Sequence, residues 1–286
     1  MKQENWKCFV NRGDKMISCK DYVEHRKKEI KEVVDGFDRK PKLCVIQIGD
    51  DAASNSYIKG KHRDCEEIGL LFDHVHIKDY ENFSQYNLTQ LIEEKNNDDT
   101  VDGIIVQLPI PDKYDVDCVT RWIAKEKDVD GFKKDSNFTP CTPKGIMDWL
   151  KYNNYDFVGK NVTVIGRSKI VGQPLVNLLI EAGATVTCCN SKTKDIGKFI
   201  FNSDLVISAI GKAKHWRNFP NNCIVVDVGI NRDENGKLCG DVDKEYVEKY
   251  WDNVYVTPSP GSVGLCTRLV LIENTIEAYM KREKVW

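Results

Sequence analysis

A tyrosine and a lysine stand four residues apart in the segment SNSYIKGK (residues 54–61), which opens a predicted helix just after a predicted strand. This spacing places Tyr57 and Lys61 on one face of the helix. The carboxyl end of a strand is where α/β proteins build their sites, so the pair could serve acid–base chemistry. The spacing alone nevertheless favours a plain surface pair, in which the lysine stem packs on the ring.

Two further polar groups of the same half stand at a strand end and in a turn. Gln107 ends the apolar run VDGIIVQL (residues 101–108), and Asp130 lies in the acidic turn DVDG (residues 128–131). We expect both to lie near Tyr57 and Lys61 in one cleft, because carboxyl ends of parallel strands share one edge of a sheet.

A glycine-containing loop, GRSKIVG (residues 166–172), lies between a predicted strand and a predicted helix. Backbone N–H groups and a helix N-terminus at such a place receive a pyrophosphate. The spacing differs from G-x-G-x-x-G, since Ser168 takes the second glycine's place and Gly172 comes one residue late. The alternative is a plain strand-to-helix turn, but the context favours dinucleotide binding.

The segment after the next strand bears on the choice of cofactor. An NAD site normally offers Asp or Glu to the ribose there, whereas this chain has NSKT (residues 190–193). With Arg167 in the preceding loop, a 2′-phosphate would meet positive charge, which favours NADP over NAD. Lys192 and Lys194 are alternatively plain surface charges.

Two successive alternations of strands and helices must position these groups. The predicted strands span residues 42–49, 72–78, 101–108, 161–166, 184–189, 204–210 and 223–230. Helices are predicted over residues 15–37, 54–70 and 84–95, from an N-cap at Thr142 to about residue 152, before Gly183, and over 267–283.

Such alternation implies parallel sheets, so we expect an α/β fold of two domains. An N-terminal catalytic domain would comprise residues 1–145 and 266–286. A Rossmann-like NADP-binding domain would comprise residues 146–265. The amphipathic terminal helix is expected to pack back on the first domain.

Composition excludes several classes of protein. The 286 residues contain 42 Lys and Arg against 44 Asp and Glu, so no basic field indicates nucleic-acid binding. No apolar run is long enough to span a membrane, and charges occupy the start MKQENWKCFVNRGDK, so we expect a cytoplasmic protein. Eleven scattered cysteines without CxxC, and a His74/His76 pair lacking a third ligand, predict neither a disulfide framework nor a metal site.

Nine segments occur in an order that resembles one enzyme family over nearly the whole chain. They are SNSYIKGK, DGIIVQLPIP, KDVDGF, PCTPKG, GRSKIVGQP, NSKT, VVDVGIN, GDVD and TPSPGSVG. The sequence is thereby similar to the bifunctional methylenetetrahydrofolate dehydrogenase/methenyltetrahydrofolate cyclohydrolase family. The resemblance implies oxidation of 5,10-methylenetetrahydrofolate by NADP, followed by hydrolysis of the methenyl product to 10-formyltetrahydrofolate in the same cleft.

The resemblance also implies roles for the four polar residues. Lys61 is the main catalytic group, Tyr57 positions or stacks on the folate, Gln107 tunes the lysine, and Asp130 holds the pterin. A carboxylate suits a pterin because the pterin presents a cluster of N–H donors.

Cofactor-binding positions carry over in the same way. Gly166, Arg167 and Ser168 match the family's GRS turn, Ser191 matches its serine after the strand, and Ile230 matches the isoleucine of VGIN. Gly172 is expected at the helix start that closes the loop. The resemblance further implies tetrahydrofolate derivatives as substrates and a homodimer formed through the cofactor domains.

Some positions depart from the family pattern. The loop after Gly131 is shortened, Ser262 replaces a glycine, Leu265 replaces a proline, and Asn190 stands where histidine is common. The runner-up function is a monofunctional methylenetetrahydrofolate dehydrogenase, which loss of Lys61 would indicate. A nucleotide-binding regulatory protein is a further alternative, and the intact set of Tyr57, Lys61, Gln107 and Asp130 argues against it. An oxidoreductase acting on shikimate-like acids is another, and no motif beyond the fold favours it.

Overall fold

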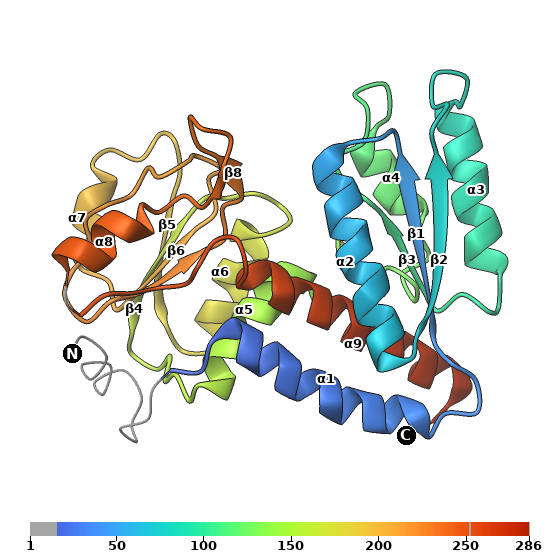
Figure 1. Cartoon of the computed structure of the whole chain (residues 1–286), viewed down its shortest axis with the longest axis horizontal. Helices are drawn as coiled ribbons and strands as arrows, with labels where there is room; N and C mark the ends of the chain where they lie inside the picture. The colour runs from blue at the N-terminus through green and yellow to red at the C-terminus, as the bar shows by residue number, and fades with distance from the viewer. Residues whose placement is uncertain (1–15, 252, 286) are drawn as a thin grey trace. The chain divides into compact units, whose positions relative to one another are not determined.

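The computed structural model describes residues 16–251 and 253–285 (Figure 1). These form two compact units, one of residues 25–141 with 268–286, the other of residues 142–267 with the segment up to Glu24. We call them the three-stranded and the five-stranded unit after their sheets. The charged N-terminal segment and the predicted helix start at Lys15 lie outside the described residues. The domain boundaries at 145 and 265 stay a prediction.

The three-stranded unit holds a parallel sheet in the order β2-β1-β3. Its strands are β1 (Lys42–Ile48), β2 (Leu71–Ile77) and β3 (Gly103–Val106). Helix α2 (Ala52–Ile68) lies along one face of the sheet, and α3 (Gln85–Asn97) lies along the other (Figure 1). Alternate β1 side chains such as Ile46 form a core cluster with residues of α3 and of α4 (Val116–Trp122).

The terminal helix α9 (Val263–Glu283) returns to this unit, as predicted. It contacts α2 through Arg268 and Asp64, and it contacts α1 (Cys19–Asp35) through Glu273 and Arg26, whose Nη2–Oε1 distance is 2.9 Å.

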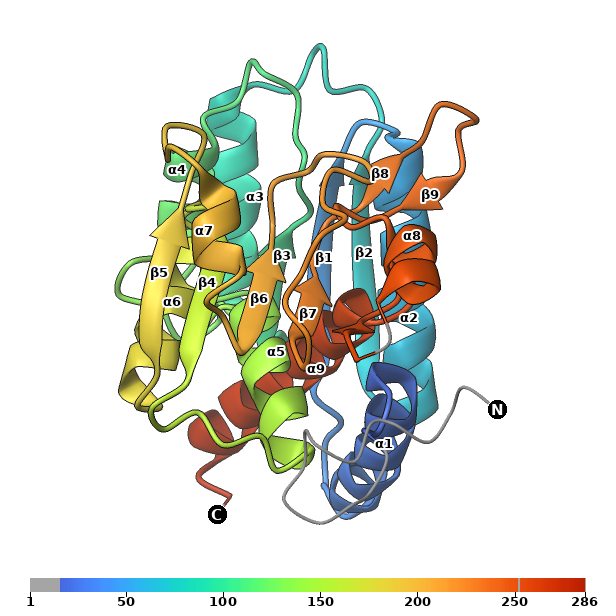
Figure 2. The ribbon, with the colours of Figure 1, turned by 90° about the vertical axis from the view of Figure 1, so that its left-hand side faces the viewer.

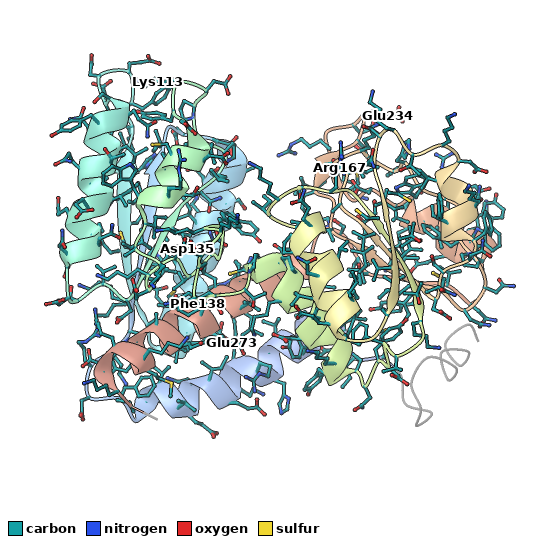
Figure 3. All side chains as sticks on the ribbon, turned by 180° about the vertical axis from the view of Figure 1, so that it is seen from behind. Lys113, Asp135, Phe138, Arg167, Glu234 and Glu273 are labelled. Atoms are coloured by element: carbon teal, nitrogen blue, oxygen red, sulfur yellow. The ribbon has the colours of Figure 1, made fainter. Side chains whose placement is uncertain are left out.

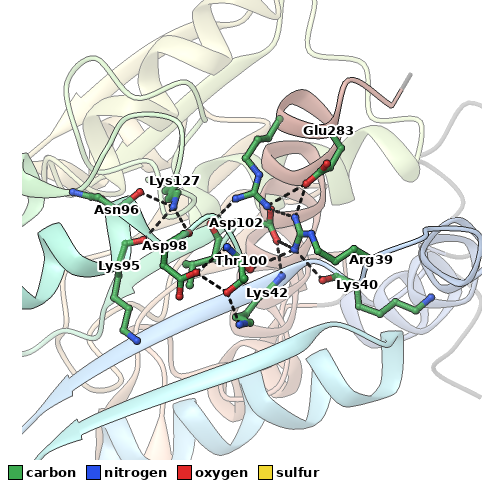
Figure 4. A network of polar contacts seen from close by, with 12 residues as sticks. Arg39, Lys40, Lys42, Lys95, Asn96, Asp98, Thr100, Asp102, Lys127 and Glu283 are labelled. Atoms are coloured by element: carbon green, nitrogen blue, oxygen red, sulfur yellow. Dashed lines mark hydrogen bonds and ion pairs between the residues drawn. The ribbon is translucent and has the colours of Figure 1, made fainter.

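A buried carboxylate, Asp102, ties the end of α9 to the start of β3 (Figure 4). Both Nη atoms of Arg39 donate to it at 2.9 Å, and Arg282 Nη2 lies 2.6 Å from its Oδ1. The backbone N–H of Lys42 donates to the same carboxylate at 2.8 Å. Because all these partners are ionic or oriented N–H groups, the carboxylate is compensated despite its burial.

The five-stranded unit holds a second all-parallel sheet in the order β10-β7-β6-β4-β5 (Figure 2). The strands are β4 (Asn161–Ile165), β5 (Thr185–Cys189), β6 (Leu205–Ser208), β7 (Ile224–Asp227) and β10 (Tyr255–Val256). From β4 the chain passes through α6 (Gly172–Glu181) to β5 and then crosses to β6 on the other side of β4. The order therefore reverses beside β4, which is where doubly wound sheets bind nucleotides.

The remaining elements are α5 (Cys141–Tyr152), α7 (Ile196–Ile200), α8 (Lys244–Tyr250) and the hairpin β8 (Asn231–Arg232) and β9 (Leu238–Cys239). The predicted N-cap at Thr142 is wrong, because α5 already begins at Cys141. Thr142 lies in the first turn, where its hydroxyl shares a 3.0 Å hydrogen bond with that of Thr267. None of the described helices is both long and apolar enough to cross a membrane.

Candidate active site

Helix α2 places Tyr57 and Lys61 where the sequence predicts them. The helix begins just after β1, and its N-cap Asp51 accepts a hydrogen bond from Ser54 N at 2.7 Å. Lys61 is only 6% exposed, and its Nζ lies 5.3 Å from the centroid of the Tyr57 ring. The lysine is therefore a buried amine, and the surface-pair interpretation that the spacing alone favours is wrong.

Gln107 orients this amine. Lys61 Nζ donates to Gln107 Oε1 at 2.9 Å, and Gln107 Nε2 donates to the backbone oxygen of Leu108 at 2.7 Å. Since the amide nitrogen is engaged by the backbone, the amide oxygen is held toward Lys61. An amide can fix the position of an amine in this way without adding charge.

The carboxylate of Asp130 is the charged partner of Lys61. Its turn is held from α9, where Asn274 Nδ2 donates to Val129 O at 2.8 Å, and from α5, where Cys141 Sγ donates to the same oxygen at 3.3 Å. Burial lowers the pKa of Lys61, against the opposing effect of Asp130. Burial likewise raises the pKa of Asp130, against the effects of Lys61 and of the Cys141 thiol.

Burial therefore works against the charged form of each group, and the charge of its partner works against burial. A neutral amine held by an amide is a proton acceptor, which an ordinary lysine at neutral pH is not. The three-stranded unit thus contains a group suited to acid–base chemistry.

The five-stranded unit provides a loop that fits a pyrophosphate. Gly166 has φ of +119°, and a Cβ there would lie 2.4 Å from Ala209 O, so the loop after β4 is packed against the end of β6. A Cβ on Gly172 would lie 2.2 Å from Gly166 O, which brings the start of α6 against the loop. Ser168 Oγ accepts from Val171 N and Gly172 N at 3.2 and 3.4 Å.

Arg167 is exposed in this loop, and Ser191, just after β5, and Ile230, after β7, are exposed as well. Burial raises the pKa of the Cys188 thiol, and the positive charge of Arg167 opposes this effect, so the guanidinium lies near the end of β5. Figure 3 shows Arg167 at the surface of its unit. Ser191 belongs to a turn closed by Lys192 N donating to Asn190 Oδ1 at 3.0 Å. A guanidinium and hydroxyl groups are donors that fit a phosphorylated dinucleotide.

Comparison with known proteins identifies the family. Residues 17–130 match the catalytic domain of tetrahydrofolate dehydrogenase/cyclohydrolase, and residues 140–283 match its NAD(P)-binding domain. The chain belongs to the tetrahydrofolate dehydrogenase/cyclohydrolase family.

Individual relatives agree with this membership. The bifunctional protein FolD of Vesicomyosocius okutanii is 42% identical over 278 residues, covering 93% of this chain and 99% of the relative. The crystal structure of the bifunctional enzyme FolD from Campylobacter jejuni superposes with a TM-score of 0.87 at 41% identity, covering 93% and 98% of the two chains. A Trypanosoma brucei dehydrogenase-cyclohydrolase complexed with NADP and an inhibitor superposes with a TM-score of 0.86 at 29% identity, covering 95% and 99%.

Two of the departures from the family pattern have local explanations. Ser262 has no left-handed backbone; the neighbouring Gly261 does, with φ of +105°, and the Ser262 hydroxyl donates to Pro258 O at 2.5 Å. In the short loop after Gly131, the buried Phe138 lies under the ammonium of Lys281, which is 5.0 Å from its ring centroid (Figure 3). The loop is thereby packed against α9.

Sequence reasoning missed two features of the candidate site. Ser54 lies on the Tyr57 face of α2, and its Oγ is buried with no hydrogen-bond partner among the described residues. Arg268 reaches the same helix from α9. The spacing of Ser54 to Tyr57 and Lys61, three and seven residues, is a helical-face signal that could have found the first.

Proposed function

We propose that this protein oxidises 5,10-methylenetetrahydrofolate with NADP and hydrolyses the resulting 5,10-methenyltetrahydrofolate to 10-formyltetrahydrofolate, in one-carbon metabolism. Membership of the dehydrogenase/cyclohydrolase family supports both steps. The observation that carries the proposal is the buried Lys61 amine, held by Gln107 and facing Asp130.

Recognition of the folate is assigned to side chains around that amine. Asp130 would accept hydrogen bonds from the N–H donors of the pterin, and a charged acceptor strengthens such bonds. The Tyr57 ring would contact the folate by stacking. The unsatisfied Ser54 hydroxyl supports a polar ligand here, because a buried hydroxyl without a partner costs free energy that a substrate group would recover.

Lys61 would handle the proton in the hydrolytic step. Water adds to the methenyl carbon while Lys61 Nζ takes a proton from the attacking oxygen. The proton held by Lys61 then passes to N5 as the carbon–N5 bond breaks, and the remaining hydroxyl proton is released to solvent, which leaves the neutral 10-formyl product. The methenyl substrate is a cation, so its presence favours the neutral amine that this step needs.

Hydride transfer depends mainly on how the five-stranded unit positions the cofactor. When bound, NADP supplies the hydride acceptor. Gly166, Ser168 and Gly172 would hold the pyrophosphate of the cofactor. Arg167 and Ser191 would hold its 2′-phosphate. The exposed Ile230 would make an apolar contact with the cofactor.

The assembly and location of the enzyme are further parts of the proposal. We propose a homodimer formed through the cofactor-binding domain, since two-fold dimers are the commonest oligomers, and a cytoplasmic location. Sedimentation equilibrium of the purified full chain measures the first, and fractionation of cells measures the second.

One experiment tests both activities. The protein is mixed with 5,10-methylenetetrahydrofolate and NADP, and both the appearance and the decay of the methenyl product are followed, with spontaneous hydrolysis subtracted. Appearance and accelerated decay are expected. Appearance without accelerated decay would favour the monofunctional dehydrogenase, which an intact Lys61 argues against, and absence of both would refute the proposal.

A further inference from the structure

The guanidinium of Arg268, on the terminal helix α9, is fixed beside α2, the helix that carries Lys61. Arg268 Nε donates to Asp64 Oδ2 at 2.5 Å, and the Arg268 side chain is only 13% exposed. Asp64 is itself buried at 2% exposure, and its other oxygen accepts from Lys27 Nζ at 2.7 Å. A carboxylate shared by two cations holds Arg268 in one place, because losing either partner would leave a buried charge uncompensated.

A glycine lets the guanidinium approach the backbone of α2. A Cβ built on Gly60 would lie 2.8 Å from Arg268 Nη1 and 3.0 Å from Cζ, so a side chain at Gly60 would displace the guanidinium. Gly60 directly precedes Lys61. The Arg268 Cζ is also 6.0 Å from the Tyr57 ring centroid, on which the Lys61 ammonium lies at 5.3 Å. Both side chains therefore lie close to the same aromatic ring.

Several groups from four segments face the Lys61 amine. They are Cys65 on α2, Asp130 before α5, Cys141 on α5 and Arg268 on α9, together with the amide of Gln107. Within this set Asp130 favours the ammonium form, whereas Arg268 disfavours it.

We propose that Arg268 is a positioning residue for the cyclohydrolase step, a fixed cation that holds Lys61 in its proton-accepting form. This inference rests on the proposed function. Arginine suits the role because its guanidinium stays charged at every pH at which the enzyme works. Burial is the larger reason for the lowered pKa of Lys61, and Arg268 offsets part of the opposing effect of Asp130.

The competing interpretation is a purely structural ion pair between α9 and α2. Both interpretations predict lower stability for Arg268→Gln, which leaves Asp64 to Lys27 alone. They differ in the charge-neutral double variant Asp64→Asn with Arg268→Gln. This variant removes the uncompensated carboxylate and should recover stability, but it still lacks the cation beside Lys61.

The test measures the Lys61 amine directly, without folate. Full-length protein labelled with ¹³C at lysine Cε is titrated by NMR, and the Lys61 signal is assigned by its absence in Lys61→Met. Arg268→Gln and the double variant should titrate at higher pH than wild type, and Arg268→Lys should stay near wild type. Arg63→Gln is the matched control, since it removes an exposed guanidinium from the same helix two residues from Lys61.

The pH profile of methenyl hydrolysis completes the test. Its acidic limb should move upward with the Lys61 titration, and each unit of movement lowers the rate on that limb about tenfold. An unmoved Lys61 titration in both charge-removing variants overturns the role of Arg268 while leaving the proposed function intact. A moved titration in a protein that hydrolyses no methenyl substrate refutes the proposed function, and with it the catalytic use of the cation.

Discussion

Replacing Lys61 by methionine separates the two proposed reactions. The thioether keeps much of the volume of the lysine stem but cannot accept a proton, so enzymatic hydrolysis of the methenyl substrate should fall by about 10²- to 10⁴-fold, the usual contribution of a general base. Oxidation depends more on holding the folate against the cofactor, so part of it should survive.

The structure indicates that the lower rate of hydrolysis in Lys61→Met reflects the missing proton acceptor and not an unfolded protein. The variant leaves Gln107 Oε1 without its 2.9 Å donor, which costs about 1–3 kcal/mol. The variant also no longer buries an amine, and because burying a polar group costs free energy, this change offsets part of that cost. The net change in unfolding free energy should therefore be smaller than the stability of an ordinary domain.

The pH dependence of stability has a definite sign. Lys61 has a lowered pKa in the folded chain, so between the folded and the unfolded pKa the unfolded chain binds more protons. Wild-type stability gains from this group as pH rises through that interval and loses that contribution as pH falls. Lys61→Met should lack this contribution, which urea titrations at several pH values measure.

The assay follows methenyl decay after hydride transfer has been stopped, corrected for spontaneous hydrolysis. Lys59→Met is the matched control, because Lys59 is exposed on the same helix and has no assigned part in the reaction. Equal enzymatic decay in wild type and Lys61→Met would refute the assignment of the proton-handling group.

Three further substitutions test the remaining assignments. Asp130→Ala should weaken folate binding and both activities while NADP binding stays nearly constant, and an unchanged folate Kd by calorimetry would remove Asp130 from the site. Arg167→Ala should lower kcat/KM for NADP by the equivalent of about 1.5–3 kcal/mol and leave NAD nearly unaffected; a wild-type preference for NAD would contradict the interpretation of this loop. Gly166→Ala should cost about 1–3 kcal/mol through its positive φ and raise the NADP Kd, as thermal unfolding and titration with NADP would measure, whereas unchanged values would mean that the loop tolerates a side chain there.

Much of the fold could be predicted because buried parallel strands are continuous apolar runs. KLCVIQI and NVTVI appear in the structure as β1 and β4 within a residue of the predicted bounds. Short elements such as α7 and the β8–β9 hairpin were missed, because five or fewer residues carry too little periodicity. The start of α5 was misplaced because Thr142 and Pro143 also fit positions inside the first turn.

The candidate site was predictable in its motifs but not in its electrostatics. Spacing placed Tyr57 and Lys61 on one face, yet only the folded chain shows the lysine buried against Gln107. The Arg268–Asp64 contact joins residues 204 positions apart. With 42 basic and 44 acidic side chains available, charge alone does not select that pair.

The return of α9 has a consequence for synthesis on the ribosome. The three-stranded sheet leaves the ribosome early, but Arg268, Asn274 and Arg282 are translated only after residues 142–267 of the five-stranded unit. Until they emerge, the nascent chain lacks a helix whose residues Leu269–Ile272 are at most 2% exposed in the finished fold. The growing polypeptide must therefore carry the apolar surface that α9 later covers exposed while residues 142–267 are translated, and transiently exposed surface of this kind is prone to aggregation.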